Sequence, residues 1–312
     1  MKIAVFGTGG VGAYFGGRLA QAGCEVHFIA RGAHLEAIKR DGLIVESIAG
    51  DFTLQPALAT DNPAEIGPVD LVLVCVKGWQ LGAVIESIAP LLHSQTAVLP
   101  LLNGVGAVAQ LSEHLTRERV LNGLCGIFAK ITGPGKVHHL GAAPWLQFGE
   151  QDNQESARCR ELLAVFERAE GFKASIPSDI GVAAWMKYIF ITSTSAVGSI
   201  TRATFGEVLA QPRTRAVLVS LITEACAVAK AHQIPLAEDA GEKVMQRIEA
   251  SESGSDTSMQ RDMMAGYPSE LHSQLGALVE MAEAAGIATP TASTLYACLT
   301  PLEHKARNAL TV

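Results

Sequence analysis

The sequence predicts an α/β protein, with a doubly wound parallel sheet in its N-terminal half and only helices in its C-terminal half. Apolar runs such as DLVLVCVK and TAVLPLLNG are continuous rather than alternating, which is typical of strands covered by helices on both faces. A strand, a glycine-rich turn and a helical pattern open the chain. After residue 177, the periodic segments have the spacing of helices.

The N-terminal half is expected to alternate strands and helices. KIAVF forms the first strand, a helical pattern follows to about Ala22, and EVHFIAR forms the second strand. Residues 43–60 predict a hairpin, inserted between strand–helix–strand units. The alternation continues to about residue 176.

The C-terminal half begins at a break in the chain. Pro177 interrupts the pattern, and Ser178 and Asp179 are favoured N-cap residues, which divides the chain into domains 1–177 and 178–312. Helical patterns follow at residues 179–198, 206–233, 236–251, 257–285 and 290–307. The polar stretch SESGSDTS at 251–258 predicts a loop between two of these helices.

The composition limits the partner and the compartment. The 312 residues are 48% hydrophobic and 18% charged, with a formal net charge of -7 and no basic block. This argues against a nucleic acid or an anionic membrane as partner, so a few placed cations must hold any anionic ligand. Six scattered cysteines without a C-x-x-C pair, and no histidine cluster, predict no metal site and a reducing cytoplasm. No apolar run approaches the length of a membrane span, so we expect a cytoplasmic protein.

The glycines after the first strand form a G-x-G-x-x-G motif that opens a helix. The first glycine permits a tight turn, the second lets the backbone approach a pyrophosphate, and the third lets helix and strand pack closely. The helix N-terminus offers N–H groups to the phosphates. The sequence therefore predicts a Rossmann-type dinucleotide site made by Gly7, Thr8, Gly9, Gly10, Val11 and Gly12.

Arg31 at the end of the second strand indicates which dinucleotide binds. A chain that binds NAD usually places Asp or Glu there to hold the ribose 2′-hydroxyl, and this sequence has none. Glu25 lies too early in the strand. A guanidinium suits the 2′-phosphate of NADP(H), so we predict NADP(H) as the cofactor and residues 1–177 as its domain.

Lys77 and Asn103 follow two further buried strands. Ligands of open parallel sheets bind at the carboxyl ends of the strands, which makes both side chains candidates for the site. The alternative for Lys77 is a solvated lysine at a helix start. Asn103, before Gly104, would equally suit a turn.

Lys187 lies in the apolar segment AWMKYIFITSTS, where no carboxylate stands one helical turn away. Burying a lone ammonium is costly, so this lysine must be partnered from elsewhere, be neutral, or face a wet cleft. The alternative is a lysine whose stem packs on apolar surface while its head reaches water.

The motifs together resemble a known family. GTGGVG at the start, KGWQ at 77–80, LLNGVG at 101–106, WMKYIF at 185–190 and SMQRDMMAGYPSE at 258–270 are similar, in this order, to ketopantoate reductases. These are the NADPH-dependent 2-dehydropantoate 2-reductases of pantothenate synthesis. The resemblance covers nearly the whole chain and implies a helical substrate and catalytic domain at 178–312.

The resemblance also implies roles for individual residues. Lys187 is similar to the family's catalytic lysine and Glu270 to its substrate-binding acid, which would also be the counter-charge that Lys187 needs. The remaining implied residues are Ser258 for the substrate, Asn103 beside the nicotinamide and substrate, and Lys77 and Gln80 in the cofactor cleft. Hydride transfer to a ketone leaves an alkoxide, so a cleft lysine would polarise the carbonyl and then protonate the oxygen.

One departure leaves the substrate open. Ketopantoate reductases have asparagines four and eight residues after the lysine, where this chain has Ile191 and Ser195. Thr192, Thr194 or Ser195 would restore part of the missing polarity, with Ser195 as the candidate for the substrate. Losing an amide from such a site changes selectivity, so the alternative is a reductase of another small 2-keto acid. A 3-hydroxyacid dehydrogenase and a non-catalytic NADP-sensing protein are further alternatives, and the helical half also suits a homodimer.

Overall fold

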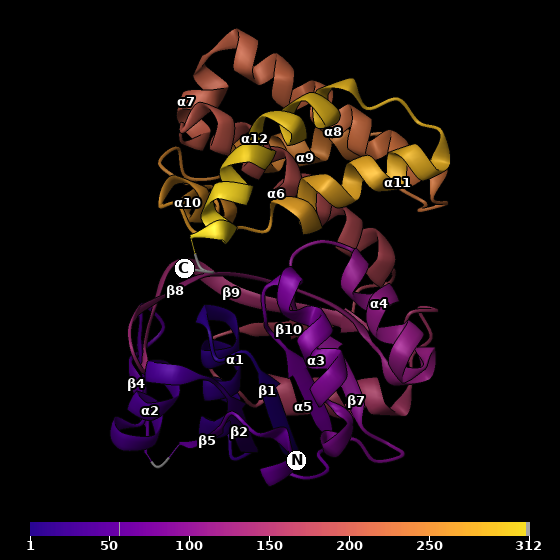
Figure 1. Cartoon of the computed structure of the whole chain (residues 1–312). Coiled ribbons are helices and arrows are strands. Elements are labelled where there is room, and N and C mark those ends of the chain that lie inside the picture. Colours follow the sequence, from indigo (N-terminus) through magenta and orange to yellow (C-terminus); the bar gives the residue numbers. More distant parts are fainter. Residues whose placement is uncertain (56, 310–312) are drawn as a thin grey trace. The chain divides into compact units, whose positions relative to one another are not determined.

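The chain folds into two compact units. The computed structural model describes residues 1–55 and 57–309 (Figure 1). The first unit comprises Met1–Leu102 and Ala107–Ile180, and the second comprises Asn103–Gly106 and Gly181–Val312. The division falls three residues after the boundary expected at 177, and the short segment Asn103–Gly106 groups with the helices. The assignment of a cofactor domain and a substrate domain stays a prediction.

A five-stranded parallel sheet forms the centre of the first unit. Its strand order is β5-β2-β1-β6-β7. The bounds are β1 (Lys2–Phe6), β2 (Glu25–Ile29), β5 (Leu58–Thr60), β6 (Leu71–Val74) and β7 (Ala97–Pro100). Ile3 of β1 pairs with Val26 on one side and with Leu71 on the other. Because the pairs are parallel, the carboxyl ends of β2, β1, β6 and β7 share one edge.

Helices and apolar side chains cover both faces of this sheet, which confirms the predicted doubly wound arrangement. One face packs against α1 (Gly10–Gln21) through residues such as Val5 and Phe15. The other face packs through Val72 and Val84 against a second set of helices. The remaining helices of this unit are α2 (Gly32–Asp41), η1 (Pro63–Glu65), η2 (Gly78–Gln80), α3 (Leu81–Ser87), η3 (Ala89–Leu91), α4 (Gly106–Leu115), η4 (Arg117–Arg119) and α5 (Ala157–Glu167).

A second five-stranded sheet corrects the expected strand–helix alternation. Its order is β10-β9-β3-β4, with β8 on β9. The bounds are β3 (Leu43–Ser47), β4 (Phe52–Leu54), β8 (Asn122–Gly133), β9 (Lys136–Gly149) and β10 (Lys173–Ser175). β8 and β9 form a long antiparallel hairpin where helices were expected to alternate with strands. The hairpin expected at 43–60 is β3–β4 alone, because β5 joins the parallel sheet beside β2.

The second unit is built around helices, as predicted. They are α6 (Ile180–Thr201), α7 (Phe205–Ala210), α8 (Pro212–Ala231), α9 (Ala240–Glu249), α10 (Ser258–Met264), the π-helix η5 (His272–Gly276), α11 (Ala277–Ala285) and α12 (Pro290–Asn308). Two predicted helices are broken. Pro212 starts a new helix, so 206–233 is divided at Gln211. Gly266, with φ +73°, and Pro268 end α10 and divide the helix predicted at 257–285.

α6 contradicts the expectation that no apolar run is long enough to span a membrane. It has 22 residues, and an 18-residue segment of it has a mean hydropathy of 1.2, which meets the requirement for a span by length and composition. Its one charged residue, Lys187, and its hydroxyl residues lower the hydropathy too little to prevent this. However, 56% of that segment is buried within the protein, where Ile189 and Val197 belong to the core of the second unit. A buried core helix passes the same test.

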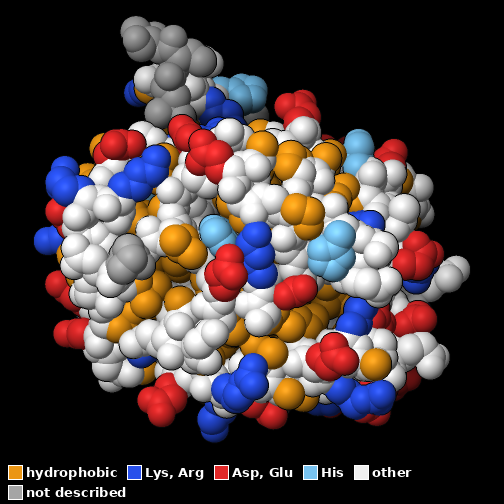
Figure 2. Space-filling model, turned by 90° about the horizontal axis from the view of Figure 1, so that it is seen from below, with side chains coloured by type: hydrophobic (Ala, Val, Ile, Leu, Met, Phe, Trp, Pro, Cys, Tyr) orange, Lys and Arg blue, Asp and Glu red, His pale blue; other side chains and the backbone are white. Residues whose placement is uncertain are grey.

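Charges of both signs are interspersed on the surface. On the face shown in Figure 2, lysine and arginine side chains alternate with acidic ones, and neither sign forms a continuous patch. This face therefore has no large basic patch, in a chain whose net charge is -7. An anion that bound here would depend on individually placed cations.

Candidate active site

The glycine loop joins β1 to α1, and its backbone requires glycine at two positions. Gly7 has φ +92°, and a Cβ on it would lie 2.9 Å from the carbonyl of Cys75. A Cβ on Gly12 would lie 2.1 Å from the carbonyl oxygen of Gly7. A Cβ on Gly9 would meet nothing within 4 Å, so this position faces open space. Gly7 and Gly12 thus build the turn, while Gly9 leaves its outer side open to a ligand.

The N-terminus of α1 is left available by its neighbours. No described side chain caps it, and its first turn holds no acidic residue. Gly10 and Val11 are its first two residues, and a Cβ on Gly10 would lie 2.5 Å from the carbonyl oxygen of Ala129. The first-turn N–H groups and the helix dipole together fit a pyrophosphate.

The side chains of Thr8 and His34 hold the glycine loop in place through hydrogen bonds. Thr8 is buried, and its hydroxyl donates to the carbonyl of Ile29 at 3.1 Å. His34 Nε2 lies 2.8 Å from the carbonyl oxygen of Thr8, while its Nδ1 accepts from the N–H of Gly135 at 3.1 Å. Nδ1 is therefore unprotonated and Nε2 carries the proton. Burial lowers the pKa of His34, which favours this neutral form. No motif or spacing pointed to His34, because both of its contacts depend on the fold.

Arg31 lies two residues after β2, at the same sheet edge as the glycine loop. Its side chain is exposed, and its backbone is extended as the N-cap residue of α2. Within the described part of the chain, its guanidinium makes no hydrogen bond or ion pair. An exposed guanidinium after this strand fits a phosphate on the adenosine ribose.

Lys77 and Gln80 form a short turn after β6. The side-chain oxygen of Gln80 accepts from the N–H of Lys77 at 3.1 Å, so Gln80 stabilises the start of η2. The ammonium of Lys77 lies 6.0 Å from the ring centroid of Trp79. The turn therefore keeps Lys77 at the carboxyl edge of the parallel sheet.

Lys187, Asn103 and Glu270 form a hydrogen-bonded chain within the second unit. The ammonium of Lys187 donates to Asn103 Oδ1 at 3.1 Å, and Asn103 Nδ2 donates to Glu270 Oε2 at 3.0 Å. Lysine only donates and a carboxylate only accepts, so the two contacts define the amide orientation. Glu270 is only 4% exposed, so its charge is held in a poorly solvated place. The lysine is thus partnered from elsewhere, one of the alternatives that its sequence left open.

Local geometry brings the three side chains together. Gly104 has φ +97°, and a Cβ on it would lie 2.7 Å from the carbonyl oxygen of Ser273, so the loop after β7 approaches η5 closely. Glu270 lies two residues before this helix, and its carbonyl accepts from the N–H of Gln274 at 2.9 Å. The buried hydroxyl of Tyr188, next to Lys187 on α6, donates to the carbonyl of Gln274 at 2.6 Å. π-Helical turns such as η5 are frequent at functional sites.

Ser258 and Ser195 are not part of the hydrogen-bonded chain from Lys187 to Glu270. Ser258 is the first residue of α10, where Thr257 supplies the cap by accepting from the N–H of Gln260. Ser195 is fully buried, and its hydroxyl has no partner among the described atoms. It lies eight residues along α6 from Lys187, about 12 Å away at the helical rise. Their proposed contacts with substrate remain predictions.

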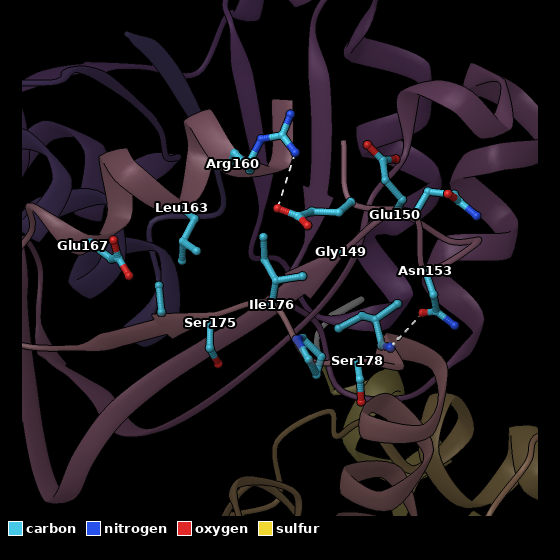
Figure 3. A pocket seen from close by; sticks show the side chains of 14 residues that line it. Gly149, Glu150, Asn153, Arg160, Leu163, Glu167, Ser175, Ile176 and Ser178 are labelled. Atoms are coloured by element: carbon cyan, nitrogen blue, oxygen red, sulfur yellow. Dashed lines mark hydrogen bonds and ion pairs between the residues drawn. The ribbon is translucent and has the colours of Figure 1, made fainter. Parts of the chain in front are cut away.

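A cavity of about 500 Å³ in the first unit contains none of the predicted site residues (Figure 3). Arg160 on one wall pairs with Glu155 at 3.4 Å. Asn153 on another wall accepts the N–H of Ile180 at 3.0 Å, so its side chain supports the first residue of α6. The cavity therefore lies beside the first residue of α6.

Neither a metal cluster nor a disulfide is found in the described residues. No three histidine, cysteine or acidic side chains lie together as a metal ion would require. All six cysteines carry free thiols.

Two family models match consecutive parts of the chain. The model described as ketopantoate reductase PanE/ApbA matches residues 3–153, and its C-terminal counterpart matches residues 179–303. The chain belongs to the ketopantoate reductase family. The resemblance inferred from the motifs is confirmed, and so is the α/β fold with a helical C-terminal part.

Curated relatives extend the match over almost the whole chain. The uncharacterized oxidoreductase YkpB of Bacillus subtilis (strain 168) is 33% identical over 301 residues, covering 96% of this chain and 98% of that protein. The 2-dehydropantoate 2-reductase of Nostoc sp. is 29% identical over 313 residues, covering 98% and 96%.

Solved structures agree with this assignment. The 2-dehydropantoate 2-reductase from Geobacter metallireducens GS-15 superposes with a TM-score of 0.90 and 31% identity, over 96% of this chain and 99% of that chain. A D-mandelate dehydrogenase solved with NADH and anilino(oxo)acetate has the same fold, with a TM-score of 0.90 and 23% identity over 98% and 99% of the two chains. This ketopantoate reductase family member is therefore an oxidoreductase acting on CH–OH, of the type that reduces 2-keto acids.

Proposed function

We propose that this protein uses NADPH to reduce a 2-keto acid, with 2-dehydropantoate as the first candidate substrate and pantoate as its product. The observation that supports this most directly is the chain from Lys187 through Asn103 to Glu270. It places one proton donor, one amide and one buried carboxylate together. A sensor of the NADP pool would need the glycine loop and Arg31, but it would not need this hydrogen-bonded chain.

Lys187 is the proposed proton donor. When bound, NADPH supplies the hydride that reduces the carbonyl carbon. The Lys187 ammonium attracts the carbonyl oxygen, stabilises the negative charge that develops on it, and then gives it a proton. Asn103 holds the ammonium by accepting a hydrogen bond from it at Oδ1, at 3.1 Å.

Glu270 has two proposed tasks. Its carboxylate offsets the charge of Lys187 through the Asn103 amide, at a hydrogen-bond distance of 3.0 Å. One oxygen bonds to Asn103, so the second is available to accept a hydroxyl of the substrate. Ser258 and Ser195 are proposed as further polar contacts, with the substrate's carboxylate or hydroxyl.

The cofactor would be held by the first unit. The N–H groups at the start of α1 would bind the pyrophosphate, with Gly9 allowing close approach. Arg31 would bind the 2′-phosphate and so favour NADPH over NADH. Lys77 and Gln80 would line the cofactor cleft.

The first experiment follows the loss of NADPH absorbance with 2-dehydropantoate and a panel of other 2-keto acids. We expect turnover by the wild type, and a loss of about 100-fold or more in kcat for Lys187→Ala with NADPH binding retained. Turnover that survives in Lys187→Ala would rule out the proposed proton donor. Tight NADPH binding without turnover of any keto acid would instead favour the sensor.

Ile191 supports a second candidate, a reductase of a 2-keto acid with a more apolar side chain. Ile191 lies one helical turn after Lys187 and is half-buried, where the family resemblance implies an asparagine. An apolar side chain there cannot hydrogen-bond a substrate hydroxyl. Ile191→Asn should therefore raise kcat/KM for 2-dehydropantoate relative to apolar 2-keto acids; an unchanged ratio would remove Ile191 from the specificity argument.

The compartment and the oligomeric state belong to the same proposal. Six free thiols suit a reducing cytoplasm. The helical half of the chain is the part proposed to contact a second copy. Size-exclusion chromatography with light scattering tests the homodimer, since a monomer at all concentrations would exclude it.

A further inference from the structure

The residue before Glu270 is held by an unusually dense set of hydrogen bonds. The N–H of Ser269 lies 3.1 Å and 3.0 Å from the two carboxylate oxygens of Glu303, and the Ser269 hydroxyl donates to Glu303 Oε2 at 2.6 Å. Ser269 is fully buried and Glu303 is 5% exposed. The same serine hydroxyl accepts the N–H of Leu271 at 3.2 Å. Both neighbours of Glu270 in the chain are thereby fixed.

Arg307 completes this arrangement on α12. Its guanidinium pairs with Glu303 Oε1 at 2.7 Å, one helical turn away, and donates to the carbonyl of Ser269 at 3.3 Å. The Ser269 backbone is therefore held at its N–H by Glu303 and at its carbonyl by Arg307. The ion pair also supplies the counter-charge that a buried carboxylate requires.

This arrangement does more than fill the core. A buried ion pair is weak evidence for stability, since apolar side chains of similar volume often stabilise a helix contact as well. Charged hydrogen bonds to one backbone position do, however, fix that position tightly. Here the fixed position adjoins the carboxylate that bonds to Asn103 at 3.0 Å. A shift of Ser269 would move Glu270 and weaken the chain to Lys187.

We propose that Glu303, paired with Arg307 and acting through Ser269, is a positioning residue for Glu270. Glu303 itself does not touch the substrate. It sets the direction of the Glu270 carboxylate toward Asn103, and thereby the place of the Lys187 ammonium. The expected effect on kcat rests on the proposed function. The expected effect on the position of the Glu270 carboxylate rests only on the contacts.

The test compares Glu303→Gln with Glu224→Gln. Glu224 is the matched control, because its carboxylate also binds two backbone N–H groups, those of Thr291 and Ala292 at 2.8 Å each, at the other end of the same helix α12. Both variants lose a charged contact with backbone. We expect kcat to fall about 10- to 100-fold in Glu303→Gln with the KM for NADPH unchanged, and kcat to be retained in Glu224→Gln.

Ser269 variants give a second measurement that tolerates weaker folding of Glu303→Gln. Ser269→Thr keeps the hydroxyl that bonds to Glu303, and Ser269→Ala removes it. We expect Ser269→Ala to lower kcat and Ser269→Thr to restore most of it. Equal kcat in both serine variants, or an equal loss of kcat in Glu303→Gln and Glu224→Gln, would overturn the proposal.

Crystal structures of the same variants separate this inference from the proposed function. We expect the distance from Asn103 Nδ2 to Glu270 Oε2 to lengthen by about 0.5 Å or more in Glu303→Gln and to be kept in Glu224→Gln. If the wild type reduces no 2-keto acid, the proposed function fails while this distance still tests the positioning role. An unchanged distance in Glu303→Gln overturns that role whatever the activity.

Discussion

Asn103 is the residue on which the candidate site depends most, since one amide bonds to both Lys187 and Glu270. Its two ends have opposite hydrogen-bonding characters, as the two partners require. The asparagine amide offers both, because its NH₂ group donates and its oxygen accepts. The identity of this residue is therefore dictated by its partners rather than by the turn in which it lies.

Asn103→Asp tests this directly. The substitution replaces the donor to Glu270 by a second carboxylate, so two like charges face each other at about 3 Å. We expect kcat to fall by roughly tenfold or more in steady-state assays. The matched control is Asn153→Asp, because Asn153 uses only its oxygen, which accepts the N–H of Ile180. A large kcat loss in the control, or none in Asn103→Asp, would contradict the bridging role.

A second prediction concerns His34 and the pH dependence of the free energy of unfolding. Burial lowers its pKa, so the unfolded chain binds more protons than the folded one as the pH falls below the ordinary value of 6.5. The stability from neutral His34 is present above that pH and is lost on acidification. Urea unfolding at about pH 7.5 and about pH 5.5 should show a smaller difference in His34→Gln than in the wild type.

His139 provides the control for this prediction. Burial lowers its pKa too, but it bonds to Ser47 and Ala142 rather than to the glycine loop. His139→Gln should likewise reduce the pH dependence of stability. Only His34→Gln should weaken NADPH binding, by roughly fivefold, because only His34 bonds to the Thr8 carbonyl. Equal NADPH affinity in both variants would show that the His34 contact does not shape the loop.

At the scale of the element, the β1–α1 turn makes two glycine substitutions behave differently. In Gly12→Ala the new methyl would lie 2.1 Å from a backbone oxygen, so we expect a loss of about 3 kcal/mol in the free energy of unfolding. In Gly9→Ala the methyl meets nothing within 4 Å, so we expect less than about 1 kcal/mol.

Ligand binding separates the two glycines further. The Gly9→Ala methyl would stand where the backbone is expected to approach the pyrophosphate, so NADPH affinity should fall by roughly tenfold or more in fluorescence titrations. Retained affinity in a folded Gly9→Ala protein would place the pyrophosphate elsewhere. The two expected outcomes would assign Gly12 to the fold and Gly9 to the ligand.

At the scale of the whole molecule, each unit has an apolar core of its own. The first unit has one cluster on each side of its parallel sheet, and the second has a single cluster among its helices. A ligand that binds only folded protein stabilises the unit that holds it. NADPH should therefore stabilise the first unit, where the glycine loop and Arg31 lie.

Charge reversal at Arg31 tests which nucleotide gives this stabilisation. At 100 times its Kd, NADPH should raise the free energy of unfolding by about 2.7 kcal/mol. In Arg31→Glu most of this stabilisation should vanish for NADPH and persist for NADH, as followed by thermal unfolding. Lys39→Glu, an exposed reversal on α2, is the control and should leave the preference unchanged. The same preference in Arg31→Glu as in the wild type would exclude a role for Arg31 at the 2′-phosphate.

The sequence by itself determined the features that depend on local geometry. The positive φ of Gly7 and the contact at Gly12 require glycine, so the spacing of the motif is readable from the chain. Apolar periodicity located β1 and α6 and separated the α/β half from the helical half. The helix predicted at 206–233 overlooked one local signal, because a proline such as Pro212 is favoured at the first position of a new helix.

Only the tertiary structure decided which distant side chains meet. Asn103 lies 84 residues from Lys187 and 167 from Glu270, and their pairing follows from how the Gly104 loop packs on η5. The β8–β9 hairpin and the placement of β5 beside β2 likewise depend on strand pairing across the unit. Glu303 gave no functional signal in the sequence, because an acid four residues before an arginine is common on helices. Its contacts with Ser269 exist only once α12 has packed, since hydrogen bonds between distant residues are set by packing and not by local spacing.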